Sequence, residues 1–379
     1  MHVDRGKDKK RWILLKNSVR SVAFSESICY NIYVKLYNAR RIEVMKAAVL
    51  RGPQDVRVEQ FPEPPMHDNC VKVAVAYCGL CGTDFHKFAG KSGSRPVTYP
   101  VPLGHEASGV VVEIGKDVTN FKVGDRVTVD PNWSCGKCHW CHKGKRHLCR
   151  NSRGVVKGMA EYICPPEENV YHIPDSLSLR DAALTEPLSC CLHGIELLDM
   201  KLGDVVVIIG MGAIGLMMLQ LCAKASAGKI IVVEPIEEKR ETALKMGATL
   251  FVNPQTEDVA KVIKENGIEC VDKVLECVGL ISTAQLALEV ADPGATVVLF
   301  GVSDNGAILP VDMYKAFTKE LTIKTSYINP GTTPAAIDLL EKKAIDLDGF
   351  IQEIAIEQLP EELQTKQFTR KGKVVVRIS

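Results

Sequence analysis

A short apolar run that leads directly into regularly spaced glycines is the feature that most narrows the possible folds. Val205–Ile209 runs into Gly210-Met211-Gly212-Ala213-Ile214-Gly215, and a helical pattern follows over Leu216–Ser226. Strand-like and helical segments then continue to alternate, at Lys229–Val233, Glu237–Met246, Lys273–Glu276 and Ala295–Phe300. Strands that alternate with helices at this rhythm predict an α/β domain with a doubly wound parallel sheet.

The glycine motif also predicts a ligand. Glycines at this spacing permit a tight turn and let backbone amides approach a pyrophosphate, while the helix start supplies partial positive charge. Glu234 ends the next strand, where its carboxylate can bind ribose hydroxyls and repel a 2′-phosphate. The repulsion by Glu234 favours NAD. Lys239 and Arg240 would soften that repulsion, which leaves NADP as the alternative. The predicted cofactor-binding residues are Gly210, Gly212, Ala213, Ile214, Gly215, Glu234, Lys239 and Arg240.

Four of the 14 cysteines crowd into one short segment, at Cys135, Cys138, Cys141 and Cys149. Four thiolates suit tetrahedral zinc and leave no open coordination position, so the cluster predicts a structural zinc that staples a loop. Unconnected thiols or an iron–sulfur cluster are the alternatives. Because such clustering favours metal over disulfides, and no secretory signal pattern is visible, we expect a cytoplasmic protein. The apolar surroundings of four others predict core-filling side chains, at Cys190, Cys191, Cys222 and Cys277.

Composition and charge exclude several classes of function. A length of 379 residues suggests about two domains, and the net charge of +1 provides no overall field for nucleic acid or an anionic membrane. No apolar run reaches the ~18 residues of a membrane span. Residues 1–44 carry ten Lys and Arg against four acids and are expected to be an extension outside the fold. A basic targeting or binding arm is the alternative for that segment.

The first half of the chain has a different pattern. Val71–Ala76 and Ala107–Ile114 alternate as antiparallel strands do, and Gly124-Asp125-Arg126-Val127 is a turn that enters another strand. The tail, Gly372–Ile378, returns to a lone strand pattern and is expected to rejoin this β-rich part. We therefore predict a first domain over residues 45–190, a cofactor domain over 191–324 and a return to the first domain over 325–379.

A second candidate metal site is dispersed along the sequence. Cys81 follows Cys78-Gly79-Leu80, His105 and Glu106 follow Gly104, and Glu186 lies in Thr185-Glu186-Pro187. No spacing rule unites these residues. From the residues alone, a surface or capping pair at His105 and Glu106 is the commoner explanation, and a redox pair at Cys78 and Cys81 is another.

Taken together, the motifs resemble those of the zinc-dependent medium-chain alcohol dehydrogenases, especially the polyol (sorbitol-type) branch. The resemblance extends from about Met45 to Ser379. It rests on motifs in the family's order: Cys81-Gly82-Thr83-Asp84, Gly104-His105-Glu106-Ala107-Ser108-Gly109, Gly124-Asp125-Arg126-Val127, the four-cysteine segment, Thr185-Glu186-Pro187-Leu188 and the glycine motif. It implies a GroES-like catalytic domain from both chain ends and a Rossmann cofactor domain between them.

The resemblance also implies roles for the dispersed residues. Cys81 and His105 look like ligands of a catalytic zinc, and Glu106 looks like an adjacent carboxylate that binds or exchanges with water. Glu186 is similar to the acid that reaches the zinc, directly or through water, in polyol dehydrogenases. Zinc would lower the pKa of a bound alcohol and so favour hydride transfer to the nicotinamide. Two zinc ions per subunit and a homotetramer or homodimer are implied as well.

Thr83 and His86 resemble the hydroxyl and imidazole of the family's proton relay, although alone they would be a turn hydroxyl and a surface histidine. The Arg-Tyr pair of sorbitol dehydrogenases is Ser326-Tyr327 here, so the resemblance does not specify sorbitol. The expected substrate is a secondary alcohol or polyol, with threonine, butanediol or a hydroxysteroid as alternatives. A zinc-free quinone reductase or a non-catalytic relative would be a different class of protein.

Overall fold

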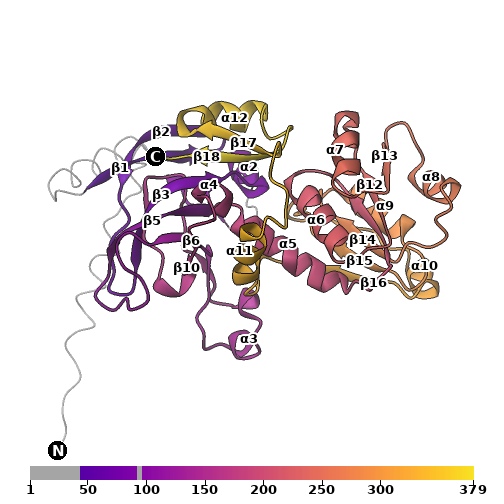
Figure 1. Ribbon diagram of the computed structural model, residues 1–379, viewed down its shortest axis with the longest axis horizontal. Helices are drawn as coiled ribbons and strands as arrows, with labels where there is room; N and C mark the ends of the chain where they lie inside the picture. Colours follow the sequence, from indigo (N-terminus) through magenta and orange to yellow (C-terminus); the bar gives the residue numbers. More distant parts are fainter. Residues whose placement is uncertain (1–42, 92–95) are drawn as a thin grey trace, which may run out of the picture. The chain divides into compact units, whose positions relative to one another are not determined.

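The computed structural model describes residues 43–91 and 96–379 (Figure 1). The extension predicted over residues 1–44 therefore lies outside the described residues, apart from its last two positions. Met45–Ser379 form one unit. Among the described residues, no helix combines the length and the apolar character that crossing a membrane requires.

Two larger sheets and a two-stranded one, β7 Asn132–Trp133 with β8 Arg153–Gly154, make up the β-rich part of the described residues. Of the two larger sheets, the smaller has the order β2-β1-β4, with bounds β1 Val44–Gly52, β2 Asp55–Pro62 and β4 Val101–Pro102. The larger has the order β10-β6-β5-β3-β18-β17, with β9 beside β3. Its bounds are β3 Val71–Gly79, β5 Glu106–Ile114, β6 Arg126–Val129, β9 Tyr162–Ile163, β10 Val170–His172, β17 Ile351–Ala355 and β18 Lys373–Arg377. Both predicted strands of the first domain are present, as β3 and β5.

The chain end joins this larger sheet, as its apolar pattern predicted. Strand β18 pairs antiparallel with β3, and β3 pairs antiparallel with β5. Gly109 allows the second pairing, because a Cβ at that position would lie 2.0 Å from the Ala74 carbonyl oxygen. Segments from residues 71–79, 106–114 and 373–377 therefore lie side by side in one sheet.

Six parallel strands form the second part, in the order β13-β12-β11-β14-β15-β16. This order is that of a Rossmann sheet and confirms the predicted doubly wound α/β fold. The strand bounds are β11 Val205–Ile209, β12 Lys229–Val233, β13 Leu250–Val252, β14 Lys273–Glu276, β15 Thr296–Leu299 and β16 Thr322–Thr325. The helix bounds are α6 Ala213–Lys224, α7 Arg240–Lys245, α8 Val259–Glu265, α9 Ile281–Val290 and α10 Met313–Thr318.

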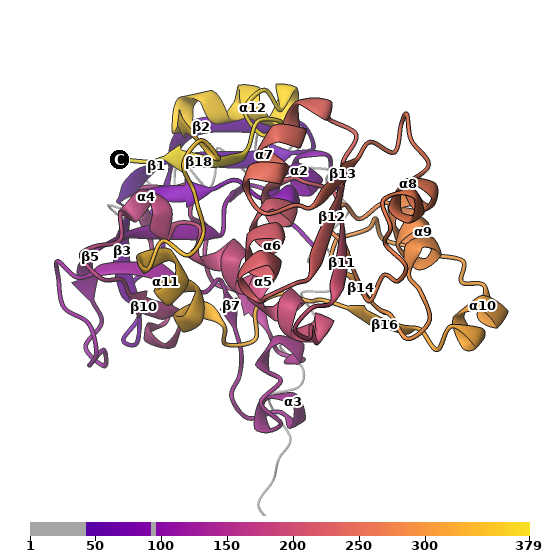
Figure 2. The same ribbon diagram turned by 45° about the vertical axis from the view of Figure 1, so that its right-hand side comes forward.

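The central strand β11 is buried on both faces, which is why it reads as a continuous apolar run. Val206 and Ile208 pack in a core with residues of α6, while Val207 and Ile209 pack in another with residues of α8 and α9. Figure 2 shows α6 on one face of the sheet and α8 and α9 on the other. The helix predicted over Glu237–Met246 starts as a 3₁₀ turn, η3, at Glu237–Lys239 and continues as α7.

Helix α5, Thr185–Leu198, connects the two parts. It contacts β5 of one sheet and β14 and β15 of the other, and it packs on α6 and α11. The proposed domain boundary between residues 190 and 191 falls inside this helix and stays a prediction. The other elements are α2 Gly82–Phe88, β7 Asn132–Trp133, α3 His139–His142, η1 Arg146–Leu148, β8 Arg153–Gly154, η2 Glu167–Asn169, α4 Leu179–Ala182, α11 Thr333–Glu341, η4 Ile356–Gln358 and α12 Leu359–Thr365.

Candidate active site and metal sites

The larger sheet brings three of the dispersed residues together. Cys81 caps helix α2 just after β3, while His105 precedes β5 and Glu106 begins it. Because Gly79 is the register partner of Glu106, the end of one strand meets the start of the other. A thiol sulfur, an imidazole nitrogen and a carboxylate oxygen of these three residues all lie within 4.8 Å of one another. The pairing of the two strands thus supplies the proximity that the sequence spacing does not show.

Buried Asp84 holds the two turns that carry this group. Its Oδ2 accepts a hydrogen bond from the Cys81 backbone N–H at 3.1 Å, and its Oδ1 accepts one from Gly104 N–H at 3.2 Å. The same Oδ1 lies 3.9 Å from Nδ1 of His105. Asp84 therefore fixes Cys81 and His105 relative to each other. The sequence motif alone does not assign a role to Asp84, although its place three residues after a helix cap is a usable signal.

A lysine from the chain end completes the group, and sequence reasoning missed it. Lys373 Nζ lies 2.7 Å from Oε1 and 2.5 Å from Oε2 of Glu106, and both side chains are buried. The available signal was a cation at the start of an otherwise apolar strand. Burial by itself lowers the pKa of this ammonium, but the negative charges of Glu106, Cys81 and Glu186 and the hydrogen bond to Glu106 together more than offset burial, so the pKa is raised.

Glu186 lies in the first turn of α5 and is buried beside the group. Burial raises its pKa to about 8, an effect that His105 opposes and that Glu106 and Cys81 reinforce. Glu186 is not among the residues whose ligand atoms all lie within 4.8 Å. Its Oε1 accepts a weak hydrogen bond from Cys190 Sγ at 3.6 Å, so this partly exposed thiol borders the site rather than simply filling the core.

The four clustered cysteines also converge. Sulfur–sulfur distances are 3.5 Å for Cys138 and Cys141, 3.8 Å for Cys138 and Cys149, and 3.5 Å for Cys149 and Cys135. Four sulfurs about 2.3 Å from a zinc ion in a tetrahedron lie about 3.8 Å apart. The spacing therefore fits a fully ligated ion. Backbone and Asn151 hydrogen bonds lower the pKa of Cys135 to about 6, which favours the thiolate form that metal binding needs.

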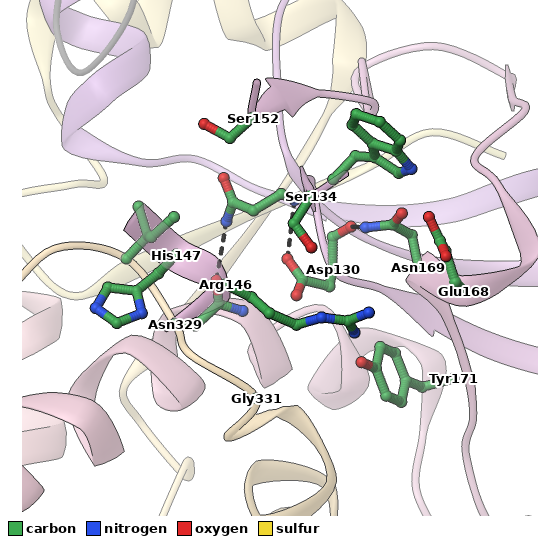
Figure 3. Close-up of a pocket in the computed structure, with 13 residues that line it drawn as sticks. Asp130, Ser134, Arg146, His147, Ser152, Glu168, Asn169, Tyr171, Asn329 and Gly331 are labelled. Carbon is green, nitrogen blue, oxygen red and sulfur yellow. Dashed lines mark hydrogen bonds between the residues drawn. The ribbon is translucent and has the colours of Figure 1, made fainter. Parts of the chain in front are cut away.

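A small polar hollow of about 60 Å³ lies beside the four-cysteine loop (Figure 3). Asn132 Nδ2 donates to Asn329 Oδ1 at 2.9 Å, and Asn169 Nδ2 donates to the Asp130 carbonyl at 2.8 Å. The first bond ties strand β7, which enters the loop, to the segment before α11, and the second ties the 3₁₀ turn η2 to the residues before β7. The lining residues are Asp130, Asn132, Trp133, Ser134, Arg146, His147, Ser152, Glu168, Asn169, Tyr171, Ile328, Asn329 and Gly331. None of them is a predicted catalytic or cofactor residue.

The glycine motif has the geometry of a phosphate-binding turn. Gly210 has φ +91°, and a Cβ there would lie 2.4 Å from a Val278 methyl group. A Cβ on Gly215 would lie 1.9 Å from the Gly210 carbonyl oxygen, so the helix can start this close to the strand only with glycine. Gly212 caps α6 and faces open space, which leaves its backbone accessible. These features fit a dinucleotide pyrophosphate.

The predicted ribose-binding residues separate into two groups. Buried Glu234 accepts hydrogen bonds from Met211 N–H at 2.7 Å and Ile236 N–H at 3.1 Å. Lys239 Nζ lies 3.6 Å from the Glu234 carboxylate and donates to the Met211 carbonyl at 3.1 Å. Both therefore lie at the glycine turn. The Arg240 guanidinium instead pairs with Glu237, and it stacks on Phe251 and donates to the carbonyl of that residue.

Thr83 and His86 both lie on α2, the helix that Cys81 caps. They are three residues apart, so they share one side of the helix, and both are partly exposed. The structure thus places both residues of the predicted relay on the helix that begins at Cys81, a candidate metal ligand.

Comparison with known proteins identifies the family. The model of the alcohol dehydrogenase GroES-like domain matches residues 67–175, and that of the zinc-binding dehydrogenase matches residues 213–342. The chain is 31% identical over 328 residues to sorbitol dehydrogenase from Bacillus subtilis (strain 168), covering 84% of this chain and 93% of that relative. The chain belongs to the zinc-dependent medium-chain alcohol dehydrogenases, in the polyol dehydrogenase branch. It is therefore an oxidoreductase, and the resemblance drawn from the motifs is confirmed.

Two further similarities show the breadth of the family. D-arabitol-phosphate dehydrogenase from Enterococcus avium is 36% identical over 299 residues, which are 76% of this chain and 84% of that relative. A solved putative zinc-binding dehydrogenase from Sinorhizobium meliloti 1021, bound to NADP, has a TM-score of 0.83 and 36% identity. The match to that structure covers 88% of this chain and 99% of the other. The predicted combination of a GroES-like and a Rossmann domain is confirmed.

Proposed function

We propose that this medium-chain dehydrogenase is a zinc-dependent NAD(H) oxidoreductase that interconverts a secondary alcohol or polyol and its ketone. The observation that carries the proposal is the convergence of Cys81, His105 and Glu106 within 4.8 Å. Thiolate, imidazole and carboxylate are the donors that zinc takes in proteins. Cys81 and His105 would hold the ion, with Glu186 reaching it directly or through water and Glu106 beside it.

The chain's own residues then orient the metal ligands and move the proton. Asp84 fixes the turns of Cys81 and His105 through two backbone hydrogen bonds. When bound, zinc supplies a Lewis acid that lowers the pKa of an alcohol hydroxyl, and the nicotinamide ring accepts the hydride. Thr83 Oγ1 would accept the hydroxyl proton while it releases its own proton towards His86 on the same helix, and His86 would pass that proton to solvent. An imidazole suits this step because its unperturbed pKa of about 6.5 is close to neutral pH.

Zinc content and an initial-rate screen test this function. We expect about two zinc ions per chain, one for each ligand set. We also expect NADH formation with at least one compound of a panel that holds polyols, secondary alcohols, threonine, butanediol and a hydroxysteroid. The compound with the highest kcat/KM decides among the substrate classes. If the protein binds no zinc and reduces quinones, it is a quinone reductase. If it binds zinc and oxidises no compound of the panel, it is a non-catalytic relative.

Asp84→Asn is expected to weaken the catalytic metal site. The amide keeps only one acceptor oxygen, so one of the two backbone hydrogen bonds that position Cys81 and His105 is lost. Groups that orient metal ligands typically change metal affinity by about 10–100-fold, and we expect a loss in this range. Competition with a chromogenic chelator measures the affinity. Asp68→Asn, at an exposed acid on the surface, is the control and should leave the affinity unchanged. Equal affinities for the two variants would exclude a positioning role.

Glu234→Ala is expected to reduce the preference for NAD over NADP by about tenfold, since one removed repulsion of about 1.4 kcal/mol has this effect. The carboxylate lies at the glycine turn, 2.7 Å from the Met211 nitrogen, where a ribose would bind. The ratio of kcat/KM for the two cofactors measures the preference. Glu238→Ala removes an exposed acid nearby and serves as the matched control. An unchanged ratio in Glu234→Ala would refute the ribose contact.

We further propose a cytoplasmic homotetramer or homodimer that acts on a small molecule, without nucleic-acid or membrane partners. The described cysteines support a reducing location, because they are free thiols. Light scattering on the purified protein tests the oligomeric state: a mass of two or four chains is expected, and a single-chain mass contradicts it.

A further inference from the structure

A buried carboxylate that belongs to neither group of candidate metal ligands lies at the carboxyl end of β14. Glu276 is the last residue of that strand and is 1% exposed. Its Oε1 atom accepts hydrogen bonds from the backbone N–H groups of Val278 and Gly279 and from the Thr283 hydroxyl, each at 2.8 Å. One oxygen thus gathers three donors from the turn over residues 277–280 and from the first turn of α9.

The backbone of the 277–280 turn has the form of an anion-binding nest. Two successive N–H groups that point to one acceptor make such a concavity. Here the chain supplies the anion itself, so the nest fastens the turn. The turn is also tightly confined: Gly279 has φ +88°, and a Cβ on Gly301 would lie 2.1 Å from the Gly279 nitrogen.

The 277–280 turn packs directly on the glycine motif. Cys277 N–H donates to the Ile209 carbonyl at 2.9 Å, immediately before Gly210. A Cβ on Gly210 would lie 2.4 Å from a Val278 methyl group, so the Val278 side chain occupies space that the glycine leaves. Val278 is nevertheless 43% exposed. Because ligands of open α/β sheets bind outside the carboxyl ends of the strands, the turn borders the predicted pyrophosphate site.

We propose that Glu276 is a positioning residue for the cofactor, whose carboxylate keeps the 277–280 turn in place against the glycine motif. Glu276 is buried and acts through Val278 and Gly279, without touching the ligand itself. Without the carboxylate the turn would populate other conformations. A dinucleotide would then bind only the fraction of molecules with the turn in place, which lowers its apparent affinity. This inference rests on the proposed function, because it needs a dinucleotide at the glycine motif.

Cofactor binding by Glu276→Gln tests the proposal. The amide oxygen is uncharged, and hydrogen bonds to a charged acceptor are about twice as strong as those to a neutral one. Fluorescence titration with NADH and with NADPH measures the dissociation constants. For the cofactor that the unmodified protein binds more tightly, we expect an increase of about tenfold. The KM for its oxidised form should rise similarly while kcat changes by less than about twofold, because the lost affinity is common to ground and transition states.

Hydrogen exchange reads the turn in the cofactor-free protein. The amides of Val278 and Gly279 should exchange about tenfold faster in Glu276→Gln, because their acceptor is weakened and the turn opens more often. Glu289→Gln changes an exposed acid on α9 in the same way and is the matched control. It should alter neither the exchange rates nor the dissociation constants.

A second variant keeps the test decisive where Glu276→Gln fails to fold. Thr283→Val removes one of the three donors and retains the carboxylate. We expect its dissociation constant for the same cofactor to rise by a smaller factor, about threefold, since one hydrogen bond of the three is lost. An unchanged constant in this variant would contradict the proposal by itself.

The outcomes separate the inference from the function on which it rests. Unchanged dissociation constants in Glu276→Gln, or unchanged exchange at Val278 and Gly279, overturn the positioning role and leave the proposed oxidoreductase intact. Unmodified protein that binds neither NADH nor NADPH overturns the cofactor of the proposed function itself.

Discussion

Cys81→Ser is expected to lower turnover of alcohol with NAD by about 1,000-fold or more while the chain stays folded. Each ~1.4 kcal/mol lost from transition-state stabilisation costs a factor of ten, and a Lewis acid supplies several kcal/mol. The substitution removes one of the three ligand atoms that lie within 4.8 Å of one another. A serine hydroxyl is a much poorer zinc ligand than a thiolate, so the catalytic ion should be lost.

Metal analysis and steady-state rates check this result together. Zinc should fall from about two ions to about one per chain, because the four-cysteine site is separate. Cys78→Ser is the matched control: Cys78 is buried nearby but belongs to neither group of candidate ligands. The control should keep both zinc ions and most of the turnover. Full turnover in a folded Cys81→Ser variant that holds one zinc would contradict the proposal that Cys81 binds a catalytic zinc.

The cofactor domain could be predicted from sequence because its signals are local. Val205–Ile209 is β11 to the residue, since a central parallel strand is apolar on both faces and ends where the glycines begin. The following helix starts earlier than its apolar pattern suggested, at Ala213 instead of Leu216. That difference has a physical reason: Gly212 caps the helix, and Gly215 lies within its first turn, where close approach to Gly210 requires glycine.

The candidate active site could be predicted only in part, because its partners meet through the pairing of distant strands. Cys81 and His105 were found through resemblance, and the register of β3 on β5 explains their proximity. Nothing in the local sequence around Glu106 indicates Lys373, which is 267 residues away in the chain. Arg240 shows the opposite difficulty. It stands next to Lys239 in sequence, yet its guanidinium pairs with Glu237 rather than lying at the glycine turn.

The four-cysteine loop shows when spacing alone suffices. Cys135, Cys138, Cys141 and Cys149 are close in sequence, so a short loop brings their sulfurs to 3.5–3.8 Å without help from distant strands. A closed thiolate site of this kind contributes to folding and offers no open position for a substrate. The two candidate metal sites should therefore respond differently to loss of one ligand.

Cys138→Ser is expected to lower Tm by about 10 °C, because loss of a metal site is among the few changes that cost more than ~4 kcal/mol. One zinc per chain should be lost. Turnover per remaining zinc, measured well below the lowered Tm, should stay close to that of the unmodified protein, because Cys81, His105 and Glu186 are untouched. Cys270→Ser, at an exposed thiol outside both groups, is the control and should change neither quantity.

The pair of readouts separates the structural from the catalytic role. Thermal unfolding followed by circular dichroism gives Tm, and metal analysis with initial rates gives turnover per bound zinc. A structural ion acts on stability and leaves the chemistry alone, so the two quantities should move independently in Cys138→Ser. If turnover disappeared while Tm and the catalytic zinc were retained, the four-cysteine loop would have to take part in the reaction, and the assignment of the chemistry to Cys81, His105 and Glu186 would be wrong.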